Sequence, residues 1–449
     1  MKHLKLLLTV IPCLIVISAC STVDEASSTL AREKVHTNAL IRCVDTDVVE
    51  AALPAKFEIV DYFGQPESAS VSGISRSGRE LPWCLLTVRA QGMSSGEAVT
   101  ELRGVLHAAH KIMLRAVAPE VREHAQDRGG HRFDPGCDDF DTAVQASAAP
   151  TGLTLPVNVS ELREMLGVPE HIRGQGANIA IFDGGVASQR TFRATSELAG
   201  LSRSFTEPDY PTRSAQADDI SDGFDCPQTV FRDGHGSIVT RIIETVAPEA
   251  NLMMLKVCDD DGFCKSSSII KALLYLRNRY EGMPTVDVIN MSFGGYVAKG
   301  DRIVRSILQD MTGMSKETLV VTSIGNYPDQ EKHYPAHFFD VHYGLVPVAA
   351  AAKTSFDDTW ELANFNNRAL LTDAIDNAIA APGVNLIVEG LGNPRGVTGT
   401  SFAAPIVSAV AALERQMHPV SNTNSQSLHA SILRHAQDFD GFKMVSLGK

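Results

Sequence analysis

The sequence predicts an α/β fold in which a parallel sheet carries helices on both faces, preceded by a small α+β N-terminal domain. After residue 155, apolar runs of strand length alternate with stretches in which apolar residues recur at helical spacing. This alternation is typical of strands that run parallel and are connected by helices. The predicted strands are 179–182, 252–257, 286–291, 318–323 and 345–351, and the predicted helices are 236–246, 267–280 and 301–312.

Two further helices are expected near the end of the chain. The one beginning near Ser401 is rich in small residues, which permit close packing against a sheet. A loop is expected over 421–426 and a last helix over 427–436.

A mixed pattern precedes the alternating region. Strands are predicted at 57–63 and 84–90, followed by one long or two short helices within 98–125. A polar stretch containing Gly and Pro then indicates a linker. The domains expected are therefore an N-terminal domain at 21–125, a linker at 126–158, a second domain at 159–436 and a tail at 437–449.

The most informative segment runs from Gly396 to Pro405 and contains Ser401. The serine stands where a helix is expected to begin, behind a glycine-rich approach, so backbone N–H groups point at whatever its hydroxyl attacks. Taken alone, Ser401 could equally be an ordinary N-cap residue. The residues upstream favour a nucleophile.

Two of those residues are an acid and a histidine. Asp183 closes a short apolar run, where open α/β sheets place their ligands. His235 lies between two glycines, which let another backbone approach closely, at the start of a predicted helix. Alone, Asp183 could be a turn residue and His235 a structural histidine.

The chain order Asp183, His235, Ser401, with the motifs around them, resembles the subtilases, the subtilisin-like serine peptidases. The resemblance covers roughly residues 155–436. It implies a subtilisin-like sheet and an endopeptidase in which Ser401 attacks, His235 transfers the proton and Asp183 orients His235. Asn326, after another apolar run, would donate to the oxyanion, although it could also be a turn residue.

The same resemblance implies how substrate is held. The segment Ser292-Phe293-Gly294 looks like the family's substrate-binding edge, and Gly325 precedes Asn326. A peptide in extended conformation would add to this edge through main-chain hydrogen bonds. The segment could also be a core strand, and both can hold.

Two departures from the family are visible. The motif Asp183-Gly184-Gly185 lacks the hydroxyl residue that many subtilases carry after the aspartate, and Ser237-Ile238 replaces the usual Thr-His. Neither removes a reacting atom. We expect a working enzyme, and a catalytically impaired protein that binds peptides is the alternative.

The N-terminal domain occupies the place of a subtilase prodomain, and a retained accessory domain is the other interpretation. It contains Ser94 in a Gly-x-Ser-x-Gly pattern, which can mark a nucleophile elbow. The domain is too short for the sheet that such an elbow needs, so we expect Ser94 to cap a helix.

The first residues resemble a bacterial lipoprotein signal. Lys2 and Lys5 precede an apolar run too short to span a bilayer. The run leads to small residues and Cys20, which predicts a signal peptide at 1–19 and lipidation of Cys20. A plain secretory signal is the alternative. The expected location is the bacterial cell envelope, anchored by lipid and facing the periplasm or surface of the outer membrane.

The remaining cysteines suggest disulfides, because an exported chain with an even number of them commonly forms bridges. Cys43 with Cys84 is the preferred pair, since both precede the linker, and Cys258 with Cys264 would close a small loop. Cys137 and Cys226 remain, and other pairings stay open. Zinc is disfavoured because no Cys-x-x-Cys pair occurs.

The formal charge is −13, which argues against nucleic acid as a partner. We expect a monomer that acts on proteins or peptides and requires no cofactor. Calcium is common in such peptidases, yet no acidic cluster has a ligand spacing that assigns a metal site.

Overall fold

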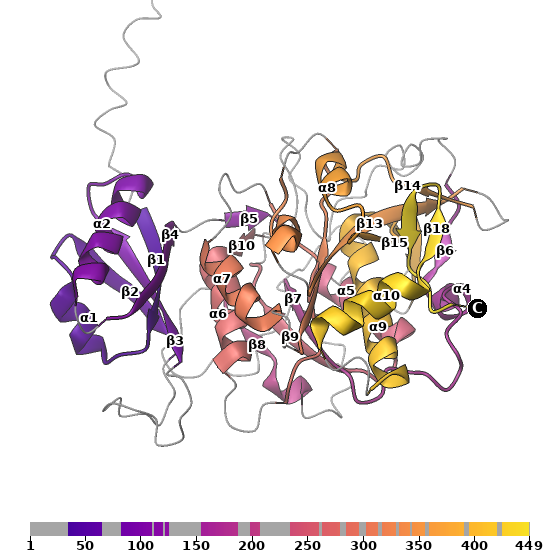
Figure 1. Cartoon of the computed structure of the whole chain (residues 1–449), viewed down its shortest axis with the longest axis horizontal. Helices are drawn as coiled ribbons and strands as arrows, with labels where there is room; N and C mark the ends of the chain where they lie inside the picture. Colours follow the sequence, from indigo (N-terminus) through magenta and orange to yellow (C-terminus); the bar gives the residue numbers. More distant parts are fainter. Residues whose placement is uncertain are drawn as a thin grey trace, which may run out of the picture.

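The computed structural model contains a small N-terminal module and a large α/β domain (Figure 1). The residues that it describes are 35–64, 82–109, 112–119, 122–124, 154–186, 198–206, 234–259, 263–278, 284–295, 302–312, 317–328, 332–341, 344–354, 359–389, 395–419 and 424–448. The predicted signal peptide, Cys20, Cys137, Cys226 and most of the predicted linker lie outside them. Within the described residues, no helix has the length and apolar character needed to span a bilayer.

The N-terminal module is a four-stranded antiparallel sheet in the order β2-β3-β1-β4. Its strands are β1 (Val35–Arg42), β2 (Phe57–Phe63), β3 (Trp83–Ala90) and β4 (Leu114–Pro119), and its helices are α1 (Thr46–Ala52) and α2 (Ser95–Ala108). Both helices pack on one face of the sheet, where Ile41, Val88, Val49 and Leu102 share a core. The expected α+β domain and its two predicted strands are therefore confirmed.

One prediction for this module was wrong in its second half. The chain leaves the helical conformation after α2, and Leu114–Pro119 forms β4 beside β1. Helical spacing of apolar residues ends before this segment, pairing with an existing strand decides its conformation, and Pro119 has no backbone N–H with which to continue a helix. The start of α2 is as expected: the Ser94 side chain accepts from the Glu97 N–H, and the Glu97 carboxylate accepts from the Ser94 N–H.

The large domain is built on a ten-stranded sheet whose path is β18-β19-β15-β13-β12-β11-β7-β9-β8, with β14 paired to β13. All pairings from β19 to β8 are parallel, while β14 and β18 pair antiparallel. The strands are β7 (Asn178–Asp183), β8 (Arg203–Ser204), β9 (Asn251–Lys256), β11 (Val288–Met291), β12 (Leu319–Ser323), β13 (Leu345–Lys353), β14 (Trp360–Leu362), β15 (Ile379–Pro382), β18 (Gln437–Phe439) and β19 (Phe442–Met444).

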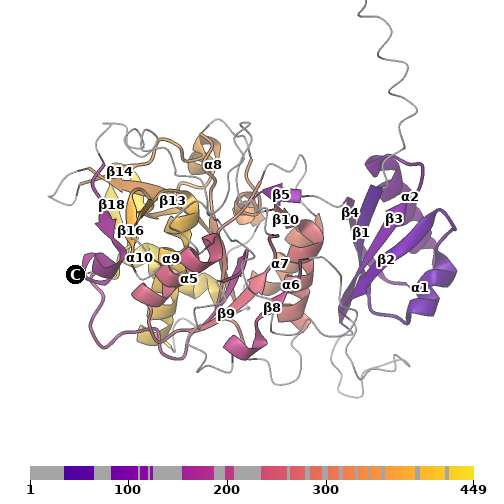
Figure 2. The ribbon, with the colours of Figure 1, turned by 180° about the vertical axis from the view of Figure 1, so that it is seen from behind.

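Helices cover both faces of this sheet, as the sequence predicted (Figure 2). They are α5 (His235–Val246), α6 (Ser266–Asn278), α7 (Arg302–Thr312), α9 (Thr400–Met417) and α10 (Ser425–His435), with two shorter ones, α4 (Leu162–Met165) and α8 (Arg368–Asp373). Ile179 and Ile181 of β7 pack with α5 and α9, whereas Ala180 and Phe182 pack with α6 and α7. This alternation is what a strand buried on both faces requires.

Small sheets complete the domain. β6 (Val157–Asn158), β16 (Leu386–Val388) and β17 (Arg395–Val397) form one of them. The other joins β10 (Phe263–Lys265) to β5 (Arg122–His124), which follows the N-terminal module in the chain. Residues after the module therefore add an antiparallel strand to the large domain.

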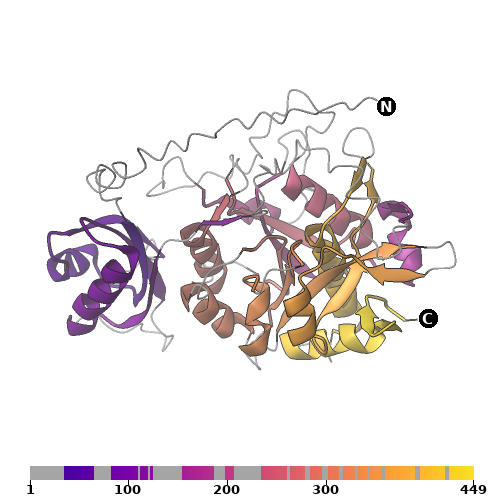
Figure 3. The same cartoon turned by 90° about the horizontal axis from the view of Figure 1, so that it is seen from above.

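The N-terminal module lies at one end of the molecule and the C-terminus at the other (Figure 3). The sheet face that its own helices leave uncovered packs against α6 and α7, where Leu40, Leu85 and Trp83 join the apolar cluster of the large domain. Polar contacts surround this apolar contact: Lys271 pairs with Asp61 at 2.5 Å, and the Asn278 amide donates to the Trp83 carbonyl at 3.1 Å. The module is thus packed onto the large domain.

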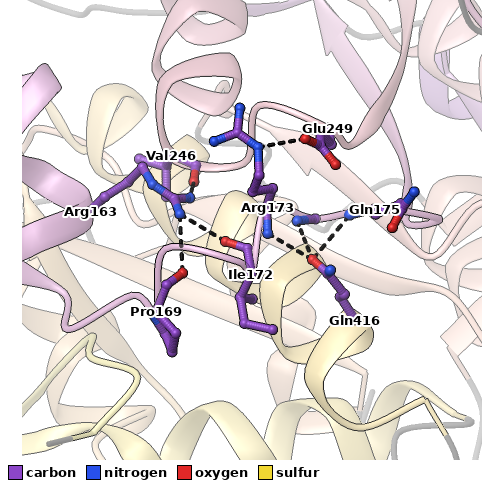
Figure 4. Close-up of polar contacts among 9 residues, drawn as sticks. Arg163, Pro169, Ile172, Arg173, Gln175, Val246, Glu249 and Gln416 are labelled. Atoms are coloured by element: carbon purple, nitrogen blue, oxygen red, sulfur yellow. Dashed lines mark hydrogen bonds and ion pairs between the residues drawn. The ribbon is translucent and has the colours of Figure 1, made fainter.

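The segment that leads into β7 is anchored to the far end of α9 (Figure 4). The Gln416 Oε1 accepts from the backbone N–H groups of Arg173, Gly174 and Gln175 at 2.8, 2.7 and 3.2 Å. The Arg163 guanidinium donates to the carbonyl of Val246 at the end of α5. These contacts tie together β7, α5 and α9, the elements that carry the candidate site.

Candidate active site

Asp183 ends β7 and His235 begins α5, and their side chains are hydrogen bonded. The His235 Nδ1 lies 2.9 Å from Oδ1 and 3.0 Å from Oδ2 of Asp183. Since a carboxylate only accepts, Nδ1 carries the proton, and Nε2 of the neutral ring is left as an acceptor. The Gly184 N–H donates to Asp183 Oδ1 at 2.8 Å. A backbone donor thus holds the carboxylate where the family's usual hydroxyl residue is missing.

The close approach of α5 to β7 depends on a glycine. A Cβ placed on Gly236 would lie 2.0 Å from the Gly185 carbonyl oxygen and 3.2 Å from Asp183 Oδ1. No side chain can be accommodated at that distance from a backbone oxygen. The glycine after His235 therefore lets the helix start reach the strand end, which is the close approach that the sequence predicted.

Ser401 lies in the first turn of α9, and Asn326, shortly after β12, contacts the same turn. The Asn326 Oδ1 accepts from the backbone N–H and from the hydroxyl of Thr400, both at 2.9 Å. These bonds orient the amide, and a Cβ placed on Gly399 would lie 3.3 Å from its Nδ2. Gly399 has φ +153°, which favours glycine. The side-chain amide of Asn326 thus lies beside the backbone of Gly399, two residues before Ser401.

The histidine ring reaches the same helix. The rings of His235 and Phe402 have centroids 5.2 Å apart, and Phe402 directly follows Ser401. The His235 Nε2 is buried and has no hydrogen-bond partner among the described residues, so no bond joins it to Ser401. Catalytic hydrogen bonds are often long without substrate and tighten when it binds. The structure brings the four sequence-predicted residues to one edge of the sheet.

The predicted substrate-binding segment follows β11. The side chains of Ser292 and Phe293 are buried, so this segment can meet a peptide only through its backbone. Gly294 packs against the ring of His333, and Gly295 exchanges backbone hydrogen bonds with Tyr334 at 3.0 and 2.9 Å. Main-chain recognition is the mode that the resemblance implies.

A buried polar chain beneath the site was missed by the sequence analysis. The Asn290 amide donates to Ser292 Oγ, and its carbonyl accepts from Ser408 of α9, both at 2.9 Å. Asn290 lies within an otherwise apolar strand, and that interruption was the available signal. The chain links the substrate-binding segment to the helix that carries Ser401.

His333 was also missed. It contacts both Gly294 and Gly325, and burial lowers the pKa of its imidazole to about 4. In the sequence it is an isolated histidine before a Tyr-Pro pair, and no motif distinguishes it. Only the fold brings it beside the predicted substrate-binding residues.

Among the described residues there are two disulfides, in the pairs that the sequence analysis favoured. Cys43 is bonded to Cys84, next to the β1–β3 pairing, and Cys258 is bonded to Cys264. The second bridge fixes β10 to the chain that leaves β9. Among the described residues, no group of three or more His, Cys, Asp or Glu side chains could hold a metal ion.

Comparisons with known proteins show which proteins this chain is similar to. A thermostable alkaline protease of Halalkalibacterium halodurans is 28% identical over 295 residues, which cover 63% of this chain and 69% of that protein. A subtilisin of a Bacillus species is 24% identical over 297 residues, covering 61% of this chain and 63% of that protein. The aligned part is therefore less than two thirds of the Bacillus protein.

The solved structure of fervidolysin from Fervidobacterium pennivorans, described as a keratinolytic enzyme related to subtilisin, has a TM-score of 0.59 and 18% identity to this chain. The likeness covers 93% of this chain and 61% of that one, and at this identity it shows the fold alone. Residues 174–446, more than half of the chain, match the subtilase family. The chain belongs to the subtilase family and has its subtilisin-like α/β fold.

Proposed function

We propose that this protein is a serine endopeptidase that cleaves peptide bonds through Asp183, His235 and Ser401. The observation that carries the proposal is the pair of hydrogen bonds from His235 Nδ1 to the buried Asp183 carboxylate. They leave Nε2 as a buried base without a partner among the described residues, on a ring packed against the first turn of α9.

In the first half of the reaction, Ser401 Oγ attacks the carbonyl carbon of the scissile peptide, and His235 Nε2 takes the hydroxyl proton. Asp183 holds the tautomer of His235 and stabilises its cation. Negative charge develops on the substrate oxygen, and the Asn326 amide and the backbone N–H of Ser401 donate to it. The carbon–nitrogen bond then breaks as His235 delivers the proton to the leaving amine, and an ester to Ser401 remains.

In the second half, water attacks that ester, with His235 again accepting a proton and returning it to Ser401 Oγ. The products are a new carboxyl end and the regenerated enzyme. The peptide is held in extended conformation on the backbone of Ser292-Phe293-Gly294, which provides affinity for many sequences.

Labelling with a fluorophosphonate tests the proposal, because this reagent modifies activated serines. We expect purified mature protein to be labelled and Ser401→Ala and His235→Ala to lose the label. Ser160→Ala is the matched control, since Ser160 is an exposed serine of the large domain that the mature chain keeps, and this variant should stay labelled. Absence of label in folded mature protein would favour the alternative, an impaired subtilase that binds extended peptides.

We further propose that the N-terminal module is a prodomain rather than a retained accessory domain. Its sheet buries apolar residues against α6 and α7, and the chain that leaves it pairs with β10 through Arg122–His124. Added strands on an exposed edge are a mode of peptide recognition, so this pairing resembles a bound substrate.

The N-terminal sequence of the mature protein distinguishes the two roles. If the module is a prodomain, the mature chain should start after residue 124. If the enzyme also cuts itself, the Ser401→Ala chain should stay uncut. An active, labelled protein that still contains the module covalently would contradict a removable prodomain. A chain without residues 21–150 that folds and becomes labelled would show that the module is dispensable for folding, leaving it as an interaction domain.

The envelope location is proposed on the sequence of residues 1–20. If Cys20 is lipidated, the uncut Ser401→Ala chain incorporates a fatty-acid analogue in bacteria and partitions with membranes, whereas the Ser401→Ala/Cys20→Ala chain does neither. Incorporation that persists in Cys20→Ala would refute the anchor.

A further inference from the structure

His333 lies between the two backbone segments that are expected to hold substrate. Backbone hydrogen bonds between Gly295 and Tyr334 fix the chain just after His333 beside the substrate-binding segment. A Cβ placed on Gly294 would lie 2.3 Å from His333 Nε2, and one placed on Gly325 would lie 2.7 Å from Nδ1. The imidazole therefore fills the space between these two glycines and needs both to be glycine.

Both ring nitrogens of His333 lack hydrogen-bond partners within the part of the chain that the structure describes. His333 is 5% exposed, and neither Nδ1 nor Nε2 has a hydrogen-bond partner among the described residues. A neutral imidazole has one N–H donor and one bare acceptor, and burying either without a partner is unfavourable. An unsatisfied polar group of this kind in a packed protein calls for a specific explanation, and a ligand that satisfies it is one.

The position of His333 relates it to the substrate residue that supplies the scissile carbonyl. Gly325 directly precedes Asn326, the expected donor to that carbonyl oxygen, and Gly294 belongs to the edge expected to pair with the peptide backbone. A residue whose carbonyl reaches Asn326 while its backbone lies along Gly294 must direct its side chain towards the space between the two glycines. That space already contains the His333 ring, so little room remains for a large side chain.

We propose that His333 determines specificity at this position, and that it selects a short side chain bearing a hydrogen-bonding oxygen, as in Ser, Asn or Asp. The inference rests on the proposed endopeptidase function and refines it. The ring excludes large apolar side chains by volume, and its N–H donates to the oxygen of a short polar one. Because burial keeps the pKa of His333 low, the ring is neutral at pH 7 and offers a donor and an acceptor without a charge.

A peptide series that differs only in the residue before the scissile bond tests the proposal on the purified mature protein. We expect wild-type kcat/KM to be roughly tenfold or more higher for Asn and Ser than for Leu and Phe, a range that pocket shape and hydrogen bonding commonly provide. His333→Ala opens the space and should reverse the order in favour of Leu and Phe. His333→Gln keeps a donor and an acceptor and should retain the polar preference.

His171→Ala is the matched control, since His171 is exposed in the same domain, and its preference should equal that of the wild type. Fluorophosphonate labelling separates the two proposals. If wild type and His333→Ala both label but share one preference, or if wild type prefers Leu or Phe, the role of His333 is refuted and the endopeptidase stands. Absence of label in folded wild type refutes the endopeptidase itself. Should His333→Ala fail to fold, the comparison of His333→Gln with wild type decides: loss of the polar preference in His333→Gln would contradict the proposal.

Discussion

Lys271 of α6 and Asp61 of β2 form an ion pair across the boundary between the large domain and the N-terminal module. Their Nζ and Oδ2 atoms are 2.5 Å apart, and the two side chains are only 2% and 10% exposed. The Lys271 ammonium also lies 5.8 Å from the ring centroid of Phe63 in the module. A buried charge of this kind depends on its partner, because water cannot replace the partner while the interface is closed.

We therefore expect Asp61→Asn to destabilise the packed module by about 3 kcal/mol, since it leaves a buried ammonium without its counter-charge. The measurement is denaturant unfolding of the full chain in a Ser401→Ala background, which prevents self-cleavage. Asp438→Asn is the matched control, because its pair with Lys443 has a carboxylate that is 77% exposed, and its cost should be small. Equal effects of the two substitutions would contradict this account of the interface.

Acid should weaken the same interface through Asp310. Burial raises the pKa of this carboxyl, but hydrogen bonds and charges from Arg115 of the module and Arg277 of α6 outweigh it, so the pKa lies below its ordinary value. A carboxyl with a lowered folded pKa contributes stability above its unfolded pKa and loses it as the pH falls through the folded pKa. The contribution should be complete above about pH 5 and decline below about pH 4.

The measurement compares Ser401→Ala with Ser401→Ala/Asp310→Asn across pH. Their difference in unfolding free energy should be constant from pH 7 to about pH 5 and shrink below about pH 4. A difference that persists unchanged at pH 3 would show that the Asp310 charge does not support the interface.

His333 should also make the folded protein less stable in acid, but for a different reason: its cation is unfavourable in the folded state. Its folded pKa of about 4 is below the model-peptide value of 6.5, because burial disfavours the cation. The unfolded chain therefore binds a proton that the folded chain does not in this window, so stability falls as the pH drops from 6.5 towards 4. His333→Gln should remove this part of the acid sensitivity, by at most about 3 kcal/mol. Unfolding curves at pH 7 and pH 5 measure it, and identical pH slopes in the two proteins would count against it.

Because α5 approaches β7 closely, substitution of Gly236 should affect activity far more than substitution of Gly184. Gly236→Ala should displace His235 from Asp183 and reduce the rate of fluorophosphonate labelling by roughly a hundredfold or more, because misplacement of a catalytic group is costly. Gly184→Ala is the control, since a Cβ there meets no atom within 4 Å and the backbone N–H to Asp183 is kept. Similar labelling rates in the two variants would refute the requirement for glycine at 236.

The anchor at Gln416 predicts a loss of stability of about 1–2 kcal/mol in Gln416→Ala, because three backbone N–H groups lose their shared acceptor. Gln175→Ala makes the same chemical change nearby, but only the backbone of Gln175 takes part in the contact. Thermal unfolding compares them. A loss in Gln175→Ala as large as that in Gln416→Ala would mean that the loss of a glutamine side chain in this region, and not the anchor, explains the effect.

Much of the fold could be predicted because it depends on local pattern. The apolar runs that became β7, β9, β11, β12 and β13 are buried on both faces, and such strands are continuous in sequence. The short strands β15, β16 and β19 were not predicted, since pairing within the folded domain, and not their composition, makes them strands. The same reason explains β4, which lies within the range 98–125 predicted to be helical and becomes a strand by pairing with β1.

By itself, the sequence determined the family, the order of the large domain's main strands and helices, and the residue types that can carry hydrolysis, because each of these is written in motifs or in periodic burial. The tertiary structure alone decided what surrounds them. It brought His333 between Gly294 and Gly325, linked Asn290 to Ser408, and closed the module onto α6 and α7. Such contacts join residues distant in the chain, and a burial pattern along one segment carries no information about which other segment will cover it.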